Sequence, residues 1–141
     1  MFDLDDTLWA CKPVIKRAEE QFYEWSGHNH EGLTEKYSPD GLVQSRIAFM
    51  RQHPQWHHNL THLRKQWLTD LASECQLDAS FVEEGFEVYW LARNEVTLFD
   101  GVADMLLRLK ERYVIGSITN GNANVSHIGI DHLFDFSVTS I

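Results

Sequence analysis

Apolar residues recur at helical spacing through the middle of the chain, from residue 13 to about residue 96. Such stripes predict four amphipathic helices, and four helices of this kind most economically form a small bundle. Pro13 suits the first turn of the first helix, because its missing N–H has no intrahelical partner there. The four stripes are Ile15, Ala18, Phe22 and Trp25; Val43, Ile47 and Met50; Leu60, Leu63, Trp67 and Leu71; and Val82, Phe86 and Tyr89.

Polar and turn-forming residues set the expected ends of these helices. Gly27 and the polar run through Asp40 predict a long loop between the first and second helices. Pro54 predicts the end of the second helix. Ser80 followed by Glu83 has the spacing of a capping box, which predicts that the fourth helix starts at Ser80 with its side chain as the cap.

The pattern changes in residues 97–141, where helical segments alternate with short apolar runs. The run "YVIGSIT" at 113–119 is rich in β-branched residues and predicts a buried parallel strand. The run "FDFSVTS" at 134–140 predicts a further strand after a short helix. Together with the apolar start before Asp3, these segments alternate as strand, helix, strand, helix and strand, which predicts an α/β fold.

Composition narrows the class of protein. A length of 141 residues with 43% apolar residues suits one compact domain, or a small core that carries an insertion. The net charge of −9 argues against a general nucleic-acid surface, because phosphate backbones need clustered Lys and Arg. That charge is compatible with one small phosphorylated substrate, which a few local donors and a cation can hold. The oligomeric state is not predicted.

The location expected from the sequence is the cytoplasm. Cys11 and Cys75 are too few and too far apart for a disulfide framework, so both are expected to be reduced. No apolar run approaches the roughly 18 residues that span a bilayer, and no signal peptide is visible. We therefore expect no contact with a membrane.

The stretch "FDLDDTLW" at 2–9 places three carboxylates within four positions, directly after the predicted first strand. A second polar segment, Thr119 to Asn122, follows a later strand, and ligands of open α/β sheets gather at such strand ends. Carboxylates alone would repel a phosphate, whereas Mg²⁺ bridges carboxylates to phosphate oxygens. The alternation of Asp3 and Asp5 therefore predicts a Mg²⁺ site, while Asp6, directly after Asp5, is expected to be structural, as in other Asp-rich turns.

Both strand ends carry a family resemblance. "FDLDDTLW" resembles the first motif of the haloacid dehalogenase superfamily, and "IGSITNGN" resembles the second. This resemblance implies a Rossmann-like α/β core, incomplete here, at residues 1–12 and 97–141, with an inserted four-helix cap of the C1 type at 13–96. Within the superfamily, "FDLDDTLWACKPVIKRAEE" and "ITNGNAN" are most similar to bacterial phosphatases acting on flavin mononucleotide and on phosphorylated ribitylaminouracil.

The resemblance implies a role for each matching residue. Asp3 would be the nucleophile that forms an aspartyl-phosphate. Asp5 would protonate the leaving oxygen and later activate the hydrolytic water. Mg²⁺ would bind the Asp3 carboxylate and the Asp5 carbonyl. Thr119 would bind the phosphoryl group, with the Asn120 and Gly121 backbone beside it. The implied reaction is Mg²⁺-dependent hydrolysis of a small phosphorylated metabolite.

The chain departs from the family pattern after the second motif. A third-motif Lys and fourth-motif acidic residues are expected beyond the last strand, and the sequence ends at Ile141 before either. We therefore expect a fragment with impaired activity. Two alternatives stay open: another hydrolase or mutase of the superfamily, such as a dehalogenase or phosphomutase, and a truncated product without catalysis.

Two sets of cap residues are expected to have no special role. Arg46, Arg64 and Arg93 could contact a substrate, but each is predicted to be a solvated charge. The histidines between the second and third helices are predicted to lie on the surface or to be partly packed, because no Cys or carboxylate completes a metal-binding set. They are His53, His57, His58 and His62.

Overall fold

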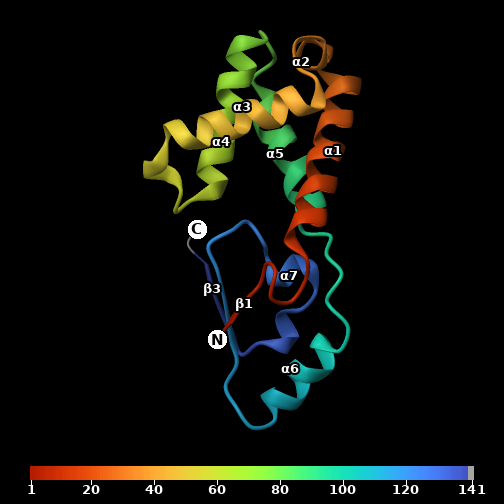
Figure 1. Ribbon diagram of the computed structural model, residues 1–141, viewed down its shortest axis with the longest axis vertical. Coiled ribbons are helices and arrows are strands. Elements are labelled where there is room, and N and C mark those ends of the chain that lie inside the picture. Colours follow the sequence, from red (N-terminus) through yellow and green to blue (C-terminus); the bar gives the residue numbers. More distant parts are fainter. Residues whose placement is uncertain (140–141) are drawn as a thin grey trace.

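A computed structural model describes residues 1–139 of the chain (Figure 1). Residues 140 and 141 lie outside the described part, and they include the last position of the predicted strand at 134–140. Within the described part, five helices form the upper half of Figure 1, and a parallel sheet with two further helices forms the lower half. No helix among residues 1–139 has the length and apolarity to cross a membrane. The cytoplasmic location stays a prediction.

The upper half is helical, and all four predicted helices are confirmed within it. They are α1 (Cys11–Asn29), α3 (Pro39–Gln52), α4 (Leu60–Glu74) and α5 (Ser80–Arg93). A fifth helix, α2 (Glu31–Lys36), lies between the first two. Helices α1 and α5 pack along each other, and α4 packs against α5. Because α1 follows the first strand and α5 precedes the rest of the sheet, this pair connects the two halves.

The prediction of a long loop at residues 27–40 is wrong. Helix α2 occupies its centre because Leu33 is fully buried in the helical core, and this contact anchors a segment that looks polar along the sequence. Helix α3 then begins at Pro39, the position where proline is best tolerated. The Ser38 hydroxyl accepts a hydrogen bond from the Gly41 N–H at 3.0 Å and so caps the helix.

The start of α5 is confirmed at Ser80, but the predicted capping box is wrong. Ala79, the residue before the helix, is already in the right-handed helical conformation, and no side chain caps the helix there. Instead, the Asp78 carboxylate accepts a hydrogen bond from the Ser80 N–H at 3.0 Å. This backbone hydrogen bond lowers the pKa of Asp78. The cap therefore acts from two positions before the helix.

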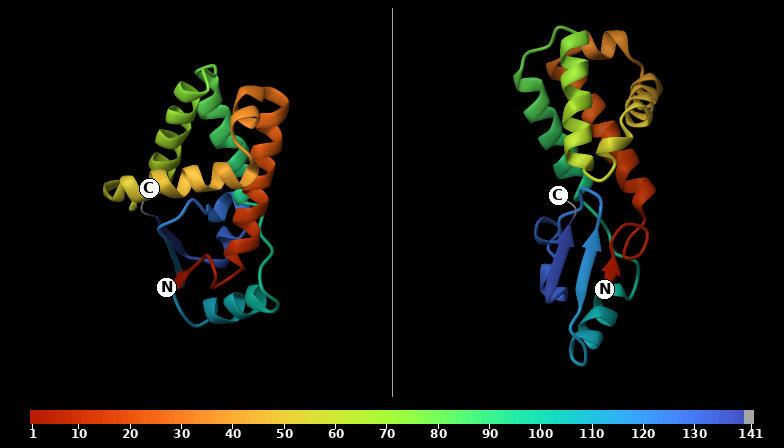
Figure 2. Two further views of the ribbon diagram at one scale, coloured as in Figure 1. Left: turned by 45° about the horizontal axis from the view of Figure 1, so that its top comes forward. Right: turned by 90° about the vertical axis from the view of Figure 1, so that its left-hand side faces the viewer.

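The sheet has three parallel strands in the order β1 (Phe2–Asp3), β2 (Gly116–Thr119) and β3 (Phe136–Thr139). Strand β2 is shorter than the predicted run, because Tyr113 and Val114 at its start are exposed and lie outside the pairing. The α/β class is confirmed. In the right-hand view of Figure 2, the arrowheads of the strands point toward the helical half. The carboxyl ends of the strands therefore face the helices.

The two faces of the sheet are covered unequally. Helix α6 (Val102–Lys110), helix α7 (Val125–Ile128) and a 3-10 turn cover one face, and Leu106 of α6 is buried there. The other face leaves Ile118 45%, Phe136 45% and Val138 43% exposed. The Phe136 ring lies over Gly116, where an added Cβ would come within 2.3 Å of the ring. A side chain at that point of β2 would therefore displace the Phe136 ring.

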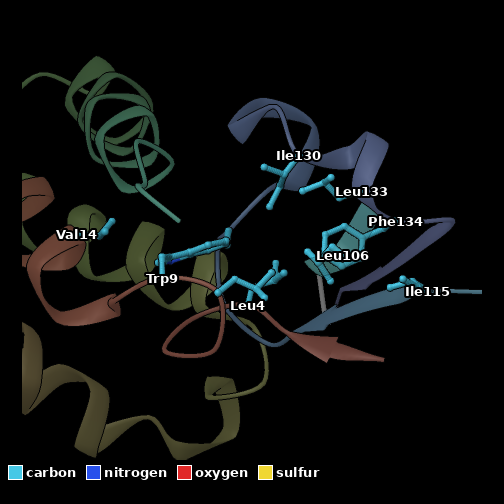
Figure 3. Packing of buried hydrophobic residues seen from close by; sticks show 10 residues of the cluster. Leu4, Trp9, Val14, Leu106, Ile115, Ile130, Leu133 and Phe134 are labelled. Atoms are coloured by element: carbon cyan, nitrogen blue, oxygen red, sulfur yellow. The ribbon is translucent and has the colours of Figure 1, made fainter. Parts of the chain in front are cut away.

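Each half has its own apolar core. The core of the sheet half gathers residues of the first-motif loop, α6, α7 and the strands, and Figure 3 shows Trp9 between Val14 on one side and Leu4 on the other. The core of the helical half is rich in aromatic rings, with Phe22 in contact with Trp25, Trp67 and Phe81. The connection between the halves therefore lies near Trp9.

Candidate active site

The first-motif loop is held in shape by its apolar residues. Leu4, Leu8 and Trp9 are each 1% exposed or less, so the chain between them must turn back toward the core. The turn places Asp6 in the left-handed region, at φ 62°, a conformation that Asp tolerates better than most residues. The Asp6 N–H donates to the Trp9 carbonyl at 2.7 Å and closes the turn.

Asp6 itself caps α1, in agreement with its predicted structural role. Its Oδ1 atom accepts a hydrogen bond from the backbone N–H of Cys11, the first residue of that helix, at 2.9 Å. A carboxylate at this position also interacts favourably with the positive end of the helix dipole. The third carboxylate of the cluster is thereby engaged by the start of α1.

The carboxylate of Asp5 is held by donors from both halves of the molecule. The indole Nε1–H of Trp9 donates to Oδ1 at 3.0 Å, and the guanidinium Nη2 of Arg93 donates to Oδ2 at 2.5 Å. Arg93 is the last residue of α5 and is 3% exposed. Both oxygens of Asp5 therefore have a fixed orientation, set by one residue of the loop and one of the helical half.

The carboxylate of Asp3 lies in a different environment. Asp3 ends β1, pairs with Ile118 of β2 and is exposed. Its side chain has no hydrogen-bond or ion-pair partner among residues 1–139, and it does not line the cavity described below. The register places it one position before Thr119 on the neighbouring strand.

The loop after β2 brings the second motif against Asp5. The buried Thr119 hydroxyl accepts a hydrogen bond from the Gly121 N–H at 3.1 Å. An added Cβ on Gly121 would lie 3.3 Å from Asp5 Oδ2, 3.5 Å from Arg93 Nη2 and 3.6 Å from Thr119 Oγ1. Three predicted residues, Asp5, Thr119 and Gly121, therefore meet at one point, and the fourth, Asn120, is exposed beside them.

Two asparagines, which the motifs do not single out, fix this loop to the helices. Asn94, directly after α5, accepts a hydrogen bond from the Asn124 N–H at 2.7 Å and donates to the Asn122 carbonyl at 3.4 Å. The side chain of Asn122 donates to the Thr61 hydroxyl of α4 at 3.2 Å. The sequence "NGNAN" indicates a loop, but its amide contacts with α4 and α5 depend on tertiary structure alone.

A cavity of about 280 Å³ lies between the strand ends and the helical half. Asp5, Asn120, Gly121 and Asn122 line it from the sheet half, and apolar residues of α3 and α4 line it from the helical half. Three arginines also line it: Arg46, Arg64 and Arg93. This arrangement offers a small, largely apolar space with charged groups at its edges, as ligand sites commonly do.

The prediction of solvated arginines is wrong for two of the three. Arg64 is 6% exposed, and its guanidinium lies 3.3 Å from the centre of the Tyr89 ring. It donates two hydrogen bonds to Glu19, at 2.8 and 3.3 Å. Arg93 is buried against Asp5, as described above. Both are buried because each has a carboxylate partner, which offsets the cost of removing a charge from water. Burial also raises the pKa of Tyr89.

The histidines from the end of α3 to the first turn of α4 are consistent with their predicted packing. His53 stacks on the Trp56 ring, and His62 meets the same ring edge-on. His57 and His58 are exposed. Ring contacts with Trp56 therefore account for His53 and His62, while His57 and His58 lie on the surface.

Cys11 lies beside Asp5 and also lines the cavity. Burial, followed by the negative charge of Asp5, raises the pKa of the Cys11 thiol from 9.0 to about 11. A thiol with so high a pKa is protonated at neutral pH, and the thiolate is the nucleophilic form. Cys11 is therefore not suited to be the nucleophile of this site.

The donors for a magnesium ion are few but of the right kind. Residues 1–139 contain no group of three or more His, Cys, Asp or Glu side chains that could together hold a metal. Mg²⁺ in phosphate-handling sites needs fewer, since it keeps several waters and binds one or two carboxylates together with substrate oxygens. The exposed carboxylate of Asp3, which forms no ion pair with any residue of 1–139, fits that pattern.

Comparison with protein families gives a match over residues 1–141 to the haloacid dehalogenase-like hydrolases. The chain belongs to this family. It is therefore a hydrolase by family, and the resemblance drawn from the two motifs is confirmed.

Individual relatives agree with the family. The chain is 27% identical, over 139 residues, to the 5-amino-6-(5-phospho-D-ribitylamino)uracil phosphatase YigB of Escherichia coli (strain K12). It is 30% identical to a 2-haloacid dehalogenase of Pseudomonas syringae pv. tomato DC3000, with a TM-score of 0.86. A putative hydrolase of the family from Bacillus subtilis, YfnB, solved with bound magnesium, is 16% identical with a TM-score of 0.59 and supports the fold alone.

The share of each chain covered is uneven. The matches cover 96% of this chain with YigB, 99% with the Pseudomonas dehalogenase and 98% with YfnB. The same matches cover 58% of YigB and 62% of each of the two solved structures. The chain thus spans about three fifths of the length of these relatives.

Proposed function

We propose that the chain carries the nucleophile and acid/base of a Mg²⁺-dependent phosphatase that hydrolyses a small phosphorylated metabolite. The observation that supports this proposal most directly is Asp5. Its carboxylate lines the cavity, two residues after Asp3, where a group that exchanges protons with a leaving alcohol is needed. In this proposal residues 13–96 act as the cap, and residues 1–12 with 97–141 as the core.

The proposed reaction has two steps. A carboxylate oxygen of Asp3 attacks phosphorus, the bond from phosphorus to the ester oxygen breaks, and Asp5 gives its proton to the leaving alcohol. Water then attacks the phosphorus of the aspartyl-phosphate, Asp5 takes a proton from that water, and inorganic phosphate leaves with Asp3 restored. Trp9 and Arg93 keep the Asp5 carboxylate oriented through both steps.

The loop after β2 supplies the proposed phosphoryl contacts. The Thr119 hydroxyl and the backbone at Asn120 and Gly121 are assigned to the phosphoryl oxygens. Gly121 has no Cβ, and one there would be tightly placed against Asp5. The absence of a side chain therefore leaves room for an anion to approach the backbone.

Magnesium would be held by the carboxylate of Asp3 and the backbone carbonyl of Asp5. When bound, the ion would draw negative charge from the phosphoryl oxygens and so reduce their repulsion of the attacking carboxylate. The exposed position of Asp3 supports this assignment, as does the lack of an ion pair between its carboxylate and any described residue.

A dehalogenase is the second candidate, and the 30% identity to the Pseudomonas 2-haloacid dehalogenase favours it. The two reactions differ in their need for Asp5. Attack on a carbon–halogen bond releases a halide, which needs no proton, whereas an ester oxygen leaves as an alcohol and does. The resemblance also implies Asp at position 5 in the members that transfer phosphoryl groups. The presence of Asp5 in the cavity therefore favours the phosphatase.

Replacing the proposed nucleophile tests the reaction. We expect D3N to lower kcat for phosphate release in the presence of Mg²⁺ by at least about 1000-fold, because an amide cannot attack phosphorus. D6N is the matched control: it removes one charge from the same loop, and Asn caps helices and adopts positive φ about as readily as Asp. Its activity is expected to stay near that of the wild type.

The assay measures phosphate release from several monoesters and halide release from a 2-haloacid, on this chain and on the longest natural chain that contains it. Phosphate release that disappears in D3N but not in D6N supports the proposal. Halide release without phosphate release would establish the dehalogenase instead. A D3N variant that keeps most of its phosphatase rate would exclude Asp3 as nucleophile.

A further inference from the structure

The arginines of the cavity differ in how far their charges are matched. Arg93 pairs with Asp5 through a hydrogen bond of 2.5 Å. Arg64 pairs with Glu19 through two hydrogen bonds, at 2.8 and 3.3 Å. Each of these two guanidinium groups is thereby neutralised by one carboxylate, and charge-assisted pairs of this geometry are strong.

Arg46 has no such partner. Its polar contact is an ion pair from Nε to Glu19 Oε1 at 3.3 Å, which is not an aligned hydrogen bond. Arg64 and Arg93 also bury one nitrogen without a partner, but each donates from another nitrogen to its carboxylate. Glu19 is already engaged by Arg64, and Arg46 donates no hydrogen bond to any described residue. Around the cavity, three guanidinium charges therefore face two carboxylates, and the surplus positive charge belongs to Arg46.

Apart from Glu19 and Arg64, the cavity wall around Arg46 is mainly apolar. Phe49 and Met50 follow it by three and four residues on α3, which places them on the same face of the helix. Leu63 and Trp67 of α4 line the same cavity. A ligand that extends from the strand ends to Arg46 would therefore meet a largely apolar wall, which favours an aromatic or aliphatic body.

We propose that Arg46 is the specificity-determining residue of the site and binds a carboxylate on the leaving group of the substrate. The inference rests on the proposed phosphatase function. The substrate class is then the phosphate monoester of a compact hydroxy acid: the phosphate lies at the strand ends, an apolar body fills the cavity, and the carboxylate meets Arg46. The planar fork of a guanidinium matches the two oxygens of a carboxylate.

The charge and the volume both favour a carboxylate over a second phosphate. With Asp5 ionised and paired with Arg93, as in this structure, the surplus is one positive charge, which one carboxylate neutralises, whereas a phosphate monoester carries about −1.5 to −2 at pH 7. The cavity, at about 280 Å³, is at the small end of the range for ligand pockets. In a chain of net charge −9, a surplus cation in an apolar cavity is also the place to which an anionic substrate would be drawn.

The test compares two substrates that differ by one carboxylate, 4-carboxyphenyl phosphate and phenyl phosphate. We expect the wild type to prefer the first, measured as the ratio of the two kcat/KM values. In R46Q this ratio should fall about tenfold or more, the loss typical of a charge-assisted hydrogen-bond pair. R46K keeps the charge but loses the planar fork, so its ratio should lie between those of R46Q and the wild type.

R51Q is the matched control. Arg51 is exposed on the same helix and does not line the cavity, so this variant has the same change in net charge without the proposed contact. Its ratio should equal that of the wild type. Thermal melting of all three variants verifies that the fold is retained, since Glu19 still has Arg64 as its partner when Arg46 is changed.

A binding measurement separates this inference from the proposed reaction. Calorimetry with 4-hydroxybenzoate and with phenol tests the contact without any turnover. R46Q should weaken the binding of 4-hydroxybenzoate by about tenfold. If no ester is hydrolysed but this loss is seen, the phosphatase proposal fails while the Arg46 contact stands. If esters are hydrolysed and R46Q and R51Q give the same ratio, the Arg46 contact is overturned and the phosphatase stands.

Discussion

The helical half and the sheet half differ in how completely they bury their apolar residues. The helical half encloses an aromatic core, in which Phe22 is fully buried among neighbouring rings. The sheet half covers one face with α6 and α7 and leaves the other open, with Phe136 45% exposed. We therefore expect buried side chains of the helical half to contribute much more to stability than side chains on the open face of the sheet.

The functional groups, in contrast, come from both halves. The proposed nucleophile and acid/base belong to the sheet half, while Arg46, Arg64 and Arg93 come from the helical half. Among the described residues, the cation paired with Asp5 is Arg93, which lies across the junction. Neither half alone contains the site, so the contacts between them determine its geometry.

A pair of phenylalanine replacements tests the difference in packing and should give the largest effect. F22A removes a fully buried ring, and such deletions cost about 3 to 5 kcal/mol in the free energy of unfolding. F136A removes a ring that is already half in water, so a loss of about 1 kcal/mol or less is expected. Urea denaturation of the two variants beside the wild type measures both. Equal losses would show that the open sheet face is as important for stability as the helical core.

Breaking the ion pair across the junction should have the next largest effect. R93M leaves the largely buried carboxylate of Asp5 without its cation, which we expect to cost about 2 to 3 kcal/mol in the free energy of unfolding. Asp5 then also loses its fixed orientation, so phosphatase activity should fall with stability. R93K, which keeps the charge, should lose less of both.

The double variant R93M/D5N determines the cause of that loss. If the cost comes from an uncompensated charge, removing the charge of Asp5 should restore part of the stability, measured again by urea denaturation. Activity should not return, because the proposed acid/base is gone. A double variant no more stable than R93M would assign the loss to packing around the Arg93 side chain instead.

Much of the fold could be predicted because its signals are local. The four longer helices show clear apolar stripes, and β2 shows a β-branched run. The prediction for residues 27–40 is wrong because the burial of Leu33 depends on helices distant in sequence. The cap of α5 differs from its prediction for a local reason. Asp78 and Ser80 both have side chains that can cap a helix, and the backbone conformation determines which of them does so.

Only those site residues that belong to the two sequence motifs could be predicted. Asp3, Asp5 and Thr119 follow from the two motifs, and the structure brings Asp5, Thr119 and Gly121 together. The cap arginines have no motif, so the sequence offered no reason to separate them from surface charges. Their burial follows from carboxylates far along the chain: Glu19 precedes Arg64 by 45 residues, and Asp5 precedes Arg93 by 88.

The pH dependence of stability distinguishes the junction from the helical half and should give the smallest effect. Cys11 lies at the junction, where burial and the charge of Asp5 raise its pKa from 9.0 to about 11. Cys75 lies in the helical half, where burial also raises its pKa. Because the folded pKa exceeds the unfolded one, the contribution of Cys11 is present below pH 9 and is lost as the pH rises through 11.

The difference in unfolding free energy between the wild type and C11S should therefore change with pH only above about pH 9, by less than about 1 kcal/mol for a partly solvated thiol. Alkylation by iodoacetamide gives a second measurement, since only the thiolate reacts. At about pH 8, near the ordinary pKa of a thiol, Cys11 should react more slowly in the folded protein than in urea, and D5N should speed its reaction while leaving that of Cys75 unchanged. If D5N leaves Cys11 as slow as before, burial alone raises its pKa, and the charge of Asp5 is fully offset by Arg93.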